Sequence, residues 1–256
     1  MKIAALQFDI QWQQPRANLN RLTAWLDAHA GADLYVLPEM FDTGFLPSEA
    51  SDGHTLEWMQ QQAALRGSAL AGSISTRSEG DGGNRLLNRL YFVRPDGSFD
   101  YYDKRHLFGY GGEDEHYQAG KRRVVTTYRG VRFLLQVCYD LRFPVWSRTR
   151  GGDYDVILYV ANWPASRIDA WNTLLKARAI ENQCYVVGVN RTGNDPQCRY
   201  CGQSAIIGPK GDVLSKGADG EECCIEAEVD MDALAAFRRK FPVLDDADRA
   251  FVEDEE

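Results

Sequence analysis

The stretch LLQVCYDLRFP, from Leu134 to Pro144, decides the fold and places the chemistry. The residues that lead into it, Val131 to Val137, are mostly apolar or β-branched, which predicts a buried strand. This strand ends at Cys138, after which the chain turns polar until it meets Pro144. In open α/β proteins, strand ends are rigid and the connections beyond them line a crevice. A thiol therefore stands where such a fold presents reactive groups.

Two other predicted strands end in residues that suit a reactive thiol. The strand ADLYVL is followed by Pro38 and Glu39, and the strand FDYYD is followed by Lys104. Covalent catalysis at a carbonyl group requires a nucleophile, a proton acceptor and a positive group where the carbonyl oxygen gains charge. Cys138, Glu39 and Lys104 supply one of each, so we interpret them as a candidate catalytic trio.

The expected mechanism follows from the pKa of a thiol. A free cysteine has a pKa of about 8.5 and is mostly protonated near neutral pH, so it needs an adjacent base. Glu39 is expected to take the proton as the sulfur attacks; its charge disfavours a thiolate, and Lys104 offsets that effect. Lys104 and the backbone N–H of Tyr139 are expected to hold the oxyanion. Glu39 then protonates the leaving ammonia and activates the water that cleaves the thioester.

Three motifs make the sequence resemble the nitrilase superfamily of carbon–nitrogen hydrolases. They are LPEMFDTGF around Glu39, YDKRHLF around Lys104 and CYDLRFP around Cys138, in the order typical of that superfamily. Within it, ANWPASR (161–167) and RAIENQCYVVGVNRTG (178–193) most resemble the bacterial ω-amidase branch. The resemblance implies a hydrolase of the side-chain amides of small 2-oxo acids.

The resemblance extends from about residue 2 to about residue 240. It implies a particular fold, a second glutamate in the active site and a dimeric assembly. The implied fold is an α/β, four-layer αββα sandwich, and we expect residues 1–256 to form a single domain with an acidic tail at about 245–256. In the family a second glutamate precedes the thiol. Counting back from the YQAG segment places it at Glu113, with Glu115 as the competing residue. A homodimer is implied as well.

Elsewhere the hydrophobic pattern alternates between the periods of strands and helices, which by itself predicts only an α/β protein. Residues 108–120 are rich in glycine and acids and are interpreted as an irregular active-site loop. Strands are expected over residues 2–10, 32–37, 70–75, 87–93, 99–103, 124–128, 131–137, 155–160, 184–189, 203–207 and 223–229, and helices around 19–26, 56–66, 174–180 and 231–240, with a short one near Trp146.

Four residues are candidates for binding the substrate. Arg142 matches a position that contacts a substrate carboxylate in some carbamoylases of the superfamily, and its planar guanidinium suits that task. The alternative is a structural ion pair between Arg142 and Asp140 or another buried acid. Arg167 is a second candidate for the carboxylate. Trp163 and Phe45 either line the pocket or belong to the core.

Composition restricts the partners of the protein. The chain has 256 residues, of which 44% are apolar, enough to fill a sizeable core. Its formal charge of −8, with no basic cluster, argues against nucleic acid or an anionic membrane as a partner. Gln7 and Asp9 interrupt the first apolar run too early for a secretory signal or a membrane span. We therefore expect a cytoplasmic protein that acts on a small molecule.

The cysteines and histidines suggest other kinds of site. Cys198 and Cys201 form a CxxC and Cys223 and Cys224 are adjacent, a set that in principle could collect zinc. The adjacent pair begins a predicted strand, where neighbours point to opposite faces, so we expect no metal, and no cofactor. The histidines lack a metal-ligand spacing such as HExxH and are interpreted as ordinary residues rather than parts of a Cys–His hydrolase or metal site: His54, His106 and His116.

The leading hypothesis is an ω-amidase-like hydrolase acting on 2-oxoglutaramate or 2-oxosuccinamate. The same trio would also serve a deaminated-glutathione amidase, a carbamoylase or a nitrilase, because the shape of the pocket decides among these substrates. Two alternatives from other classes are a catalytically retired binding scaffold and a zinc or thiol-redox protein built on the C-terminal cysteines. The intact trio favours an enzyme.

Overall fold

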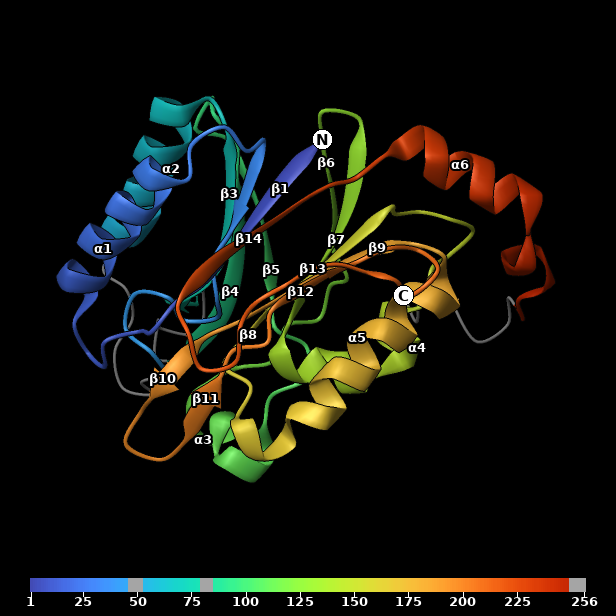
Figure 1. The fold of residues 1–256 in the computed structure, drawn as a ribbon. Coiled ribbons are helices and arrows are strands. Elements are labelled where there is room, and N and C mark those ends of the chain that lie inside the picture. The colour runs from blue at the N-terminus through green and yellow to red at the C-terminus, as the bar shows by residue number, and fades with distance from the viewer. Residues whose placement is uncertain (46–52, 79–84, 249–256) are drawn as a thin grey trace.

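The structure is a computed structural model that describes residues 1–45, 53–78 and 85–248 (Figure 1). The helices are α1 (Pro15–Ala28), α2 (His54–Arg66), α3 (Glu113–His116), α4 (Pro144–Ser147), α5 (Ile168–Asn182) and α6 (Met231–Lys240). The strands are β1 (Lys2–Gln7), β2 (Leu34–Val36), β3 (Ala69–Arg77), β4 (Leu86–Val93), β5 (Phe99–Asp103), β6 (Val125–Tyr128), β7 (Val131–Val137), β8 (Val156–Ala161), β9 (Tyr185–Asn190), β10 (Thr192–Asn194), β11 (Arg199–Cys201), β12 (Ala205–Ile207), β13 (Val213–Lys216) and β14 (Cys223–Glu228).

Most strands belong to two six-stranded sheets that share one pattern. In the first sheet, ordered β14-β1-β2-β3-β4-β5, the strands β1, β2 and β3 are parallel and the flanking strands antiparallel. In the second, ordered β13-β12-β9-β8-β7-β6, the parallel centre is β7, β8 and β9. Parallel strands have their carboxyl ends at the same edge of a sheet, and open α/β sheets bind ligands at that edge. The segments that follow β2, β7 and β8 begin at such carboxyl ends.

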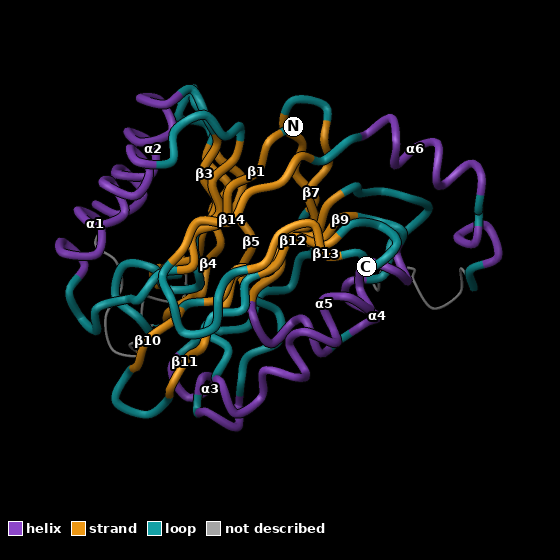
Figure 2. Tube along the Cα trace, in the orientation of Figure 1, coloured by secondary structure: helices purple, strands orange, loops and turns teal. Residues whose placement is uncertain are grey.

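The two sheets pack face to face, and helices cover both outer faces (Figures 1 and 2). Helices α1 and α2 lie over the first sheet, and α4 and α5 lie over the second. The alternation along β1 shows this division: Ile3 and Ala5 join the core between the sheets, whereas Ala4 and Leu6 pack with residues of α1 and α2. The predicted four-layer αββα sandwich is confirmed.

The central strands of the second sheet are covered on both faces. Strand β7 occupies the residues that the sequence predicted, and all six residues of β8 are buried. Such strands accept few polar side chains, because both faces are removed from water. Polar groups therefore gather where these strands end.

The structure corrects the sequence prediction where elements are short. Strands β10, β11 and β13 were not predicted, because runs of three or four residues are too short for alternation to be visible. Residues 108–120 were expected to be irregular, but they contain a helical turn, Gly109–Gly111, and the helix α3. Gly112, with φ +73°, separates the two, and a backbone reversal at a single glycine leaves no periodic signal.

The adjacent cysteines of β14 lie on opposite faces of their sheet. Cys223 packs towards the core between the sheets and Cys224 towards the side of α1 and α2, as expected for neighbours on a strand. Every cysteine of the chain is a free thiol. In the three described ranges, no group of three or more His, Cys, Asp or Glu side chains is arranged to hold a metal ion.

Two further expectations concern the surroundings of the protein. None of the helices in the described part of the chain is long and apolar enough to cross a membrane. Of the predicted acidic tail, Asp245 and Asp246 lie in a short helical turn, Val243–Asp246, and residues 249–256 lie outside the described residues. The cytoplasmic location and the homodimer stay predictions.

Candidate active site

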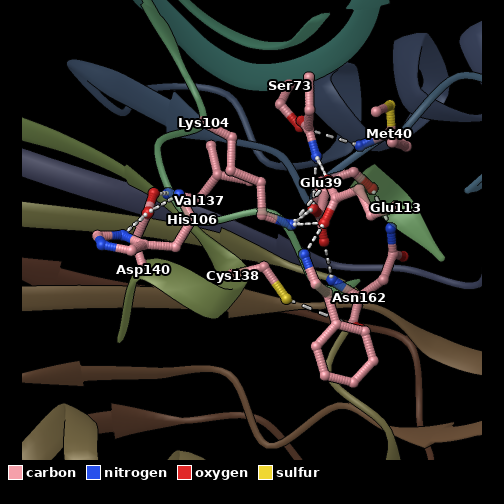
Figure 3. A network of polar contacts seen from close by, with 12 residues as sticks. Glu39, Met40, Ser73, Lys104, His106, Glu113, Val137, Cys138, Asp140 and Asn162 are labelled. Carbon is pink, nitrogen blue, oxygen red and sulfur yellow. Dashed lines mark hydrogen bonds and ion pairs between the residues drawn. The ribbon is translucent and has the colours of Figure 1, made fainter. Parts of the chain in front are cut away.

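The ends of three strands bring the predicted trio together (Figure 3). Glu39 follows β2, Lys104 follows β5 and Cys138 follows β7. The Lys104 ammonium lies 3.0 Å from Glu39 Oε1, and the Cys138 sulfur lies 3.9 Å from the carbonyl oxygen of Asn162, whose N–H groups donate to Glu39. Lys104 and Glu39 are each only 1% exposed and Cys138 is 9% exposed. The trio thus occupies one nearly dry site, with the sulfur nearest to solvent.

The backbone turns sharply at two of these strand ends. Cys138 has φ +45°, and Met40, directly after Glu39, has φ +49°. A non-glycine residue in this left-handed region costs about 1–3 kcal/mol and persists only where its surroundings hold it. The turns direct the carboxylate and the thiol out of their strands and towards each other. Cys138 also begins the helical turn Cys138–Arg142, which places the N–H of Tyr139 in a first turn, where N–H groups have no intrahelical acceptor.

Both carboxylate oxygens of Glu39 accept hydrogen bonds. Oε1 accepts from Lys104 Nζ at 3.0 Å and from Asn88 Nδ2 at 2.7 Å. Oε2 accepts from the backbone N–H of Asn162 at 2.8 Å, and the side-chain amide of Asn162 donates to the Glu39 carbonyl at 2.9 Å. The carboxylate is therefore fixed in orientation beside the thiol.

The structure distinguishes between the two candidate supporting acids. Glu113 is 1% exposed, and its two oxygens lie 3.0 and 2.8 Å from Lys104 Nζ. The backbone N–H of Phe108 also donates to Glu113, at 2.6 Å. Glu115 is exposed on the wall of the adjoining pocket. Glu113, and not Glu115, is the second acid in contact with the lysine.

Burial and charge set the protonation states. Burial alone would lower the pKa of Lys104, but Glu113 and Glu39 outweigh it and raise this pKa well above its usual value. Burial raises the pKa of Glu113, against the opposing charge of Lys104. Burial and then the Glu39 charge raise the pKa of Cys138 well above its usual value, although Lys104 acts in the opposite direction. The expected offset by Lys104 is thus not complete, and the resting thiol is protonated.

A pocket of about 260 Å³ opens from the sulfur and contains all four predicted substrate-binding residues in its wall. Trp163 is buried, with its N–H groups bonded to Asn190 and to the Arg167 carbonyl. Phe45 packs on the ring of Tyr117. Both aromatic residues therefore combine the two expected roles, because each is packed by neighbours and also faces the pocket.

The two arginines of the pocket lie on aromatic rings. The guanidinium of Arg142 is 5.0 Å from the centre of the Trp163 ring, and that of Arg167 is 5.1 Å from the centre of the Phe108 ring. The alternative pair of Arg142 with Asp140 does not form, since the donors to Asp140 are other groups. Within the described ranges, neither arginine makes an ion pair, so both are available to an anion.

Sequence reasoning missed several residues of this site. Asn88 bridges the two acids through one nitrogen, 2.7 Å from Glu39 and 3.2 Å from Glu113. A usable signal existed, because Asn88 is a polar residue inside the otherwise largely apolar strand β4. The segment from 195 to 200, at the short hairpin of β10 and β11, also lines the pocket. No sequence pattern placed it there.

Known proteins of one family are similar to this chain over nearly its whole length. The carbon-nitrogen hydrolase family matches residues 2–239. The omega-amidase YafV of Escherichia coli (strain K12) is 44% identical, with 97% of each chain covered. The 2-oxoglutaramate amidase of Bacillus subtilis is 36% identical, with 95% of this chain and 96% of the relative covered. Among solved structures, XC1258 of Xanthomonas campestris, described as a CN-hydrolase superfamily protein with an arsenic adduct in the active site, superposes with a TM-score of 0.91 at 41% identity, over 97% of each chain.

Fold and site together define a hydrolase that acts on carbon–nitrogen bonds. The chain belongs to the carbon–nitrogen hydrolase family, within the nitrilase superfamily. The resemblance stated from the three motifs is confirmed.

Proposed function

We propose that the protein is an ω-amidase that hydrolyses the side-chain amide of a small 2-oxo acid, 2-oxoglutaramate or 2-oxosuccinamate, to the carboxylic acid and ammonia. One observation carries the proposal: the buried trio of Glu39, Lys104 and Cys138 adjoins a small pocket in which two arginines, within the described residues, have no acidic partner. The names of the relatives in Escherichia coli and Bacillus subtilis support the same substrate class.

The first half of the reaction forms a thioester. Because the resting thiol is protonated, its proton must leave as the sulfur attacks, and the neighbouring Glu39 carboxylate accepts it. The new C–S bond places negative charge on the former carbonyl oxygen. The ammonium of Lys104 and the N–H of Tyr139 stabilise this oxyanion. Glu39 returns the proton to the amide nitrogen, the C–N bond breaks and ammonia leaves.

The second half of the reaction releases the acid. A water molecule attacks the thioester while Glu39 takes one of its protons. The C–S bond then breaks, and the sulfur regains a proton from Glu39. The same carboxylate thus serves both halves. Its hydrogen bonds from Lys104, Asn88 and Asn162 keep it in place throughout.

Glu113 supports the lysine rather than the substrate. A buried ammonium beside one carboxylate would readily transfer its proton or move, but two carboxylates hold Lys104 charged. An ammonium kept in this way is prepared for a developing oxyanion. Its charge therefore needs no rearrangement when the transition state forms.

The pocket supplies the preference for a carboxylate. Arg142 and Arg167 present guanidinium groups on aromatic surfaces, a setting in which a planar carboxylate can accept paired hydrogen bonds. A volume of about 260 Å³ favours a substrate of few atoms. We assign the carboxylate of the 2-oxo acid to this arginine side of the pocket and the amide to the sulfur.

Ammonia release from a substrate panel tests the proposal. The panel contains 2-oxoglutaramate, 2-oxosuccinamate, deaminated glutathione, N-carbamoyl amino acids and simple nitriles, with Cys138→Ala as the control. We expect the highest kcat/KM for the 2-oxo acid amides and no activity above background in the variant. A higher kcat/KM for another class would overturn the substrate assignment, and activity in the variant would overturn the mechanism.

A further inference from the structure

A second buried polar network lies beside the trio and takes no part in the proton transfers described above. Its centre is Asp140, whose side chain is fully buried. Oδ1 accepts from the backbone N–H of His106 at 3.0 Å and lies 2.8 Å from Nδ1 of the same residue. Oδ2 accepts from the hydroxyl of Tyr102 at 2.8 Å and from the N–H of Val137 at 3.0 Å. The carboxylate therefore has four donors, enough to compensate for its burial.

These donors come from the two segments that carry reacting groups (Figure 3). Val137 directly precedes Cys138, and Asp140 lies in the same turn. Tyr102 and His106 flank Lys104 on either side. Through one carboxylate, the turn that bears the nucleophile is thus tied to the segment that bears the ammonium.

The Tyr102 hydroxyl is held as a donor to Asp140. It accepts from the N–H of Arg105 and from the indole N–H of Trp146, both at 3.0 Å, which leaves its own proton for Asp140. Burial raises the pKa of Tyr102 well above its usual value, so the hydroxyl keeps that proton. This side of the network is fixed by the fold.

The His106 ring is the more exposed half of the network. Asp140 is an acceptor when ionised, so Nδ1 must carry a proton to bond to it. The ring also stacks on Phe143, with centres 3.8 Å apart and planes 7° apart. Phe143 directly follows the nucleophile turn and donates its N–H to the Asp140 carbonyl at 3.0 Å. One imidazole therefore contacts the nucleophile turn twice, once by hydrogen bond and once by stacking.

We propose that Asp140 and His106 are a positioning pair for the reaction, which holds the turn of Cys138 at a fixed place relative to Lys104. Neither side chain lines the substrate pocket, so neither is a catalytic residue. The turn needs such support because Cys138 adopts a left-handed conformation, which L-residues avoid unless their surroundings hold them. The inference rests on the roles proposed for Cys138 and Lys104.

Three histidine variants test the pair. His106→Ala removes the hydrogen bond and the stack, whereas His106→Asn keeps a donor at the place of Nδ1. His29→Ala is a matched control, because the His29 ring also makes one hydrogen bond, to the Trp25 carbonyl at 2.9 Å, and one stack, on Trp25, at the end of α1 and outside the pocket wall. Each variant is assayed below its unfolding temperature for kcat, KM and the rate at which iodoacetamide alkylates Cys138 relative to Cys198.

We expect His106→Ala to lower kcat roughly 10- to 100-fold, the effect of displacing a reacting group by about 1 Å, with KM nearly unchanged. The alkylation rate of Cys138 should change while that of Cys198 does not, because the burial and the Glu39 charge that raise the pKa of Cys138 depend on its position, and His106→Asn should restore most of kcat and of the original alkylation rate. The inference is overturned if His106→Ala loses no more kcat than His29→Ala, if only KM changes, or if the asparagine variant is as slow as the alanine variant.

Two further measurements keep the test decisive. Should His106→Ala not fold, Asp140→Asn is measured in its place, because it keeps the shape of the side chain but turns one acceptor into a donor. Should no amide of the panel be hydrolysed by the unaltered protein, the proposed function fails, while the alkylation ratio still reports on the position of Cys138. Failure of the function and failure of the positioning pair are therefore separate results.

Discussion

The two sheets share one strand pattern and deliver different chemistry. Each has three parallel central strands, with one antiparallel strand on one side and two on the other. The first sheet supplies Glu39 and Lys104 at its strand ends and Asn88 from within β4. The second supplies Cys138 and the part of the pocket wall that carries Arg142, Trp163 and Arg167. In the proposed mechanism, the first sheet therefore holds the acid–base groups, and the second holds the nucleophile and the two arginines of the pocket.

The middle strands show the difference most directly. Glu39 follows β2 and Asn162 follows β8, each the central strand of its parallel set. They face each other, since Asn162 donates two hydrogen bonds to Glu39, at 2.8 and 2.9 Å. The same place in the strand pattern thus carries a carboxylate in one sheet and an amide in the other. The shared scaffold determines where a strand ends, and the residue placed there determines the chemistry.

Removing the nucleophile should have the largest effect. Cys138→Ala is expected to lower kcat at least about 10⁴-fold, because no other group can carry the acyl intermediate. Steady-state ammonia release measures this loss. Cys223→Ala, in β14 and outside the site, should keep the original rate. Comparable losses in both variants would mean that the change acts through the fold.

Glu39→Gln should have the second-largest effect. We expect it to lower kcat roughly 10²- to 10⁴-fold, the usual contribution of a general base. The Glu39 charge is one cause of the raised pKa of Cys138, so its removal must lower that pKa. The pH profile of Cys138 alkylation should therefore move to lower pH in the variant. A profile that stays in place or moves to higher pH would contradict the assigned charge of Glu39.

Glu113→Gln should have a smaller effect that grows with pH. Among the charge interactions that raise the pKa of Lys104, that with Glu113 is the largest, so its loss lowers this pKa. The reaction needs the ammonium, so the alkaline limb of the pH profile should move to lower pH in the variant than in the unaltered protein. At a pH above the shifted limb, the variant should lose about 10- to 100-fold in activity. The pH profile of kcat measures the shift. Glu115→Gln should leave the alkaline side unchanged, and an equal shift there would contradict the choice of Glu113.

The arginines of the second sheet should give the smallest effects, and these should fall on KM. Loss of a hydrogen bond to a charged group costs about 1.5–3 kcal/mol, so Arg142→Ala or Arg167→Ala should raise KM for 2-oxoglutaramate roughly 10- to 100-fold. Hydrolysis of a simple aliphatic amide without a carboxylate should not change. If the hydrolysis of both substrates is impaired equally, the arginines support the structure of the pocket rather than bind the carboxylate. The proposed division of roles between the two sheets would then be wrong for the arginines.

The sequence predicted the trio because each member follows a recognisable strand and stands in a motif. It also predicted the layered fold, since long strands such as β7 and β8 have clear apolar patterns. What it could not predict depends on contacts between distant segments. Asn88 meets Glu39 across 49 positions and Asn162 meets Glu39 across 123, and no local pattern records such pairs.

Other features were hidden for related reasons. The raised pKa of the Cys138 thiol arises from burial, a property of the packed molecule that the motif alone does not contain. His106 looked ordinary because its partner, Asp140, lies 34 positions away. Strands of three residues, such as β10, form only because neighbouring segments pair with them.

The central claim is that Cys138 carries the acyl group, with Glu39 and Lys104 beside it. Mass spectrometry of acid-quenched turnover with 2-oxoglutaramate tests this claim most directly. We predict an adduct of the mass of the acyl group on the peptide that contains Cys138 and on no other cysteine peptide, which disappears when the substrate is exhausted. An adduct on another residue, or steady ammonia release by the Cys138→Ala variant, would contradict the account.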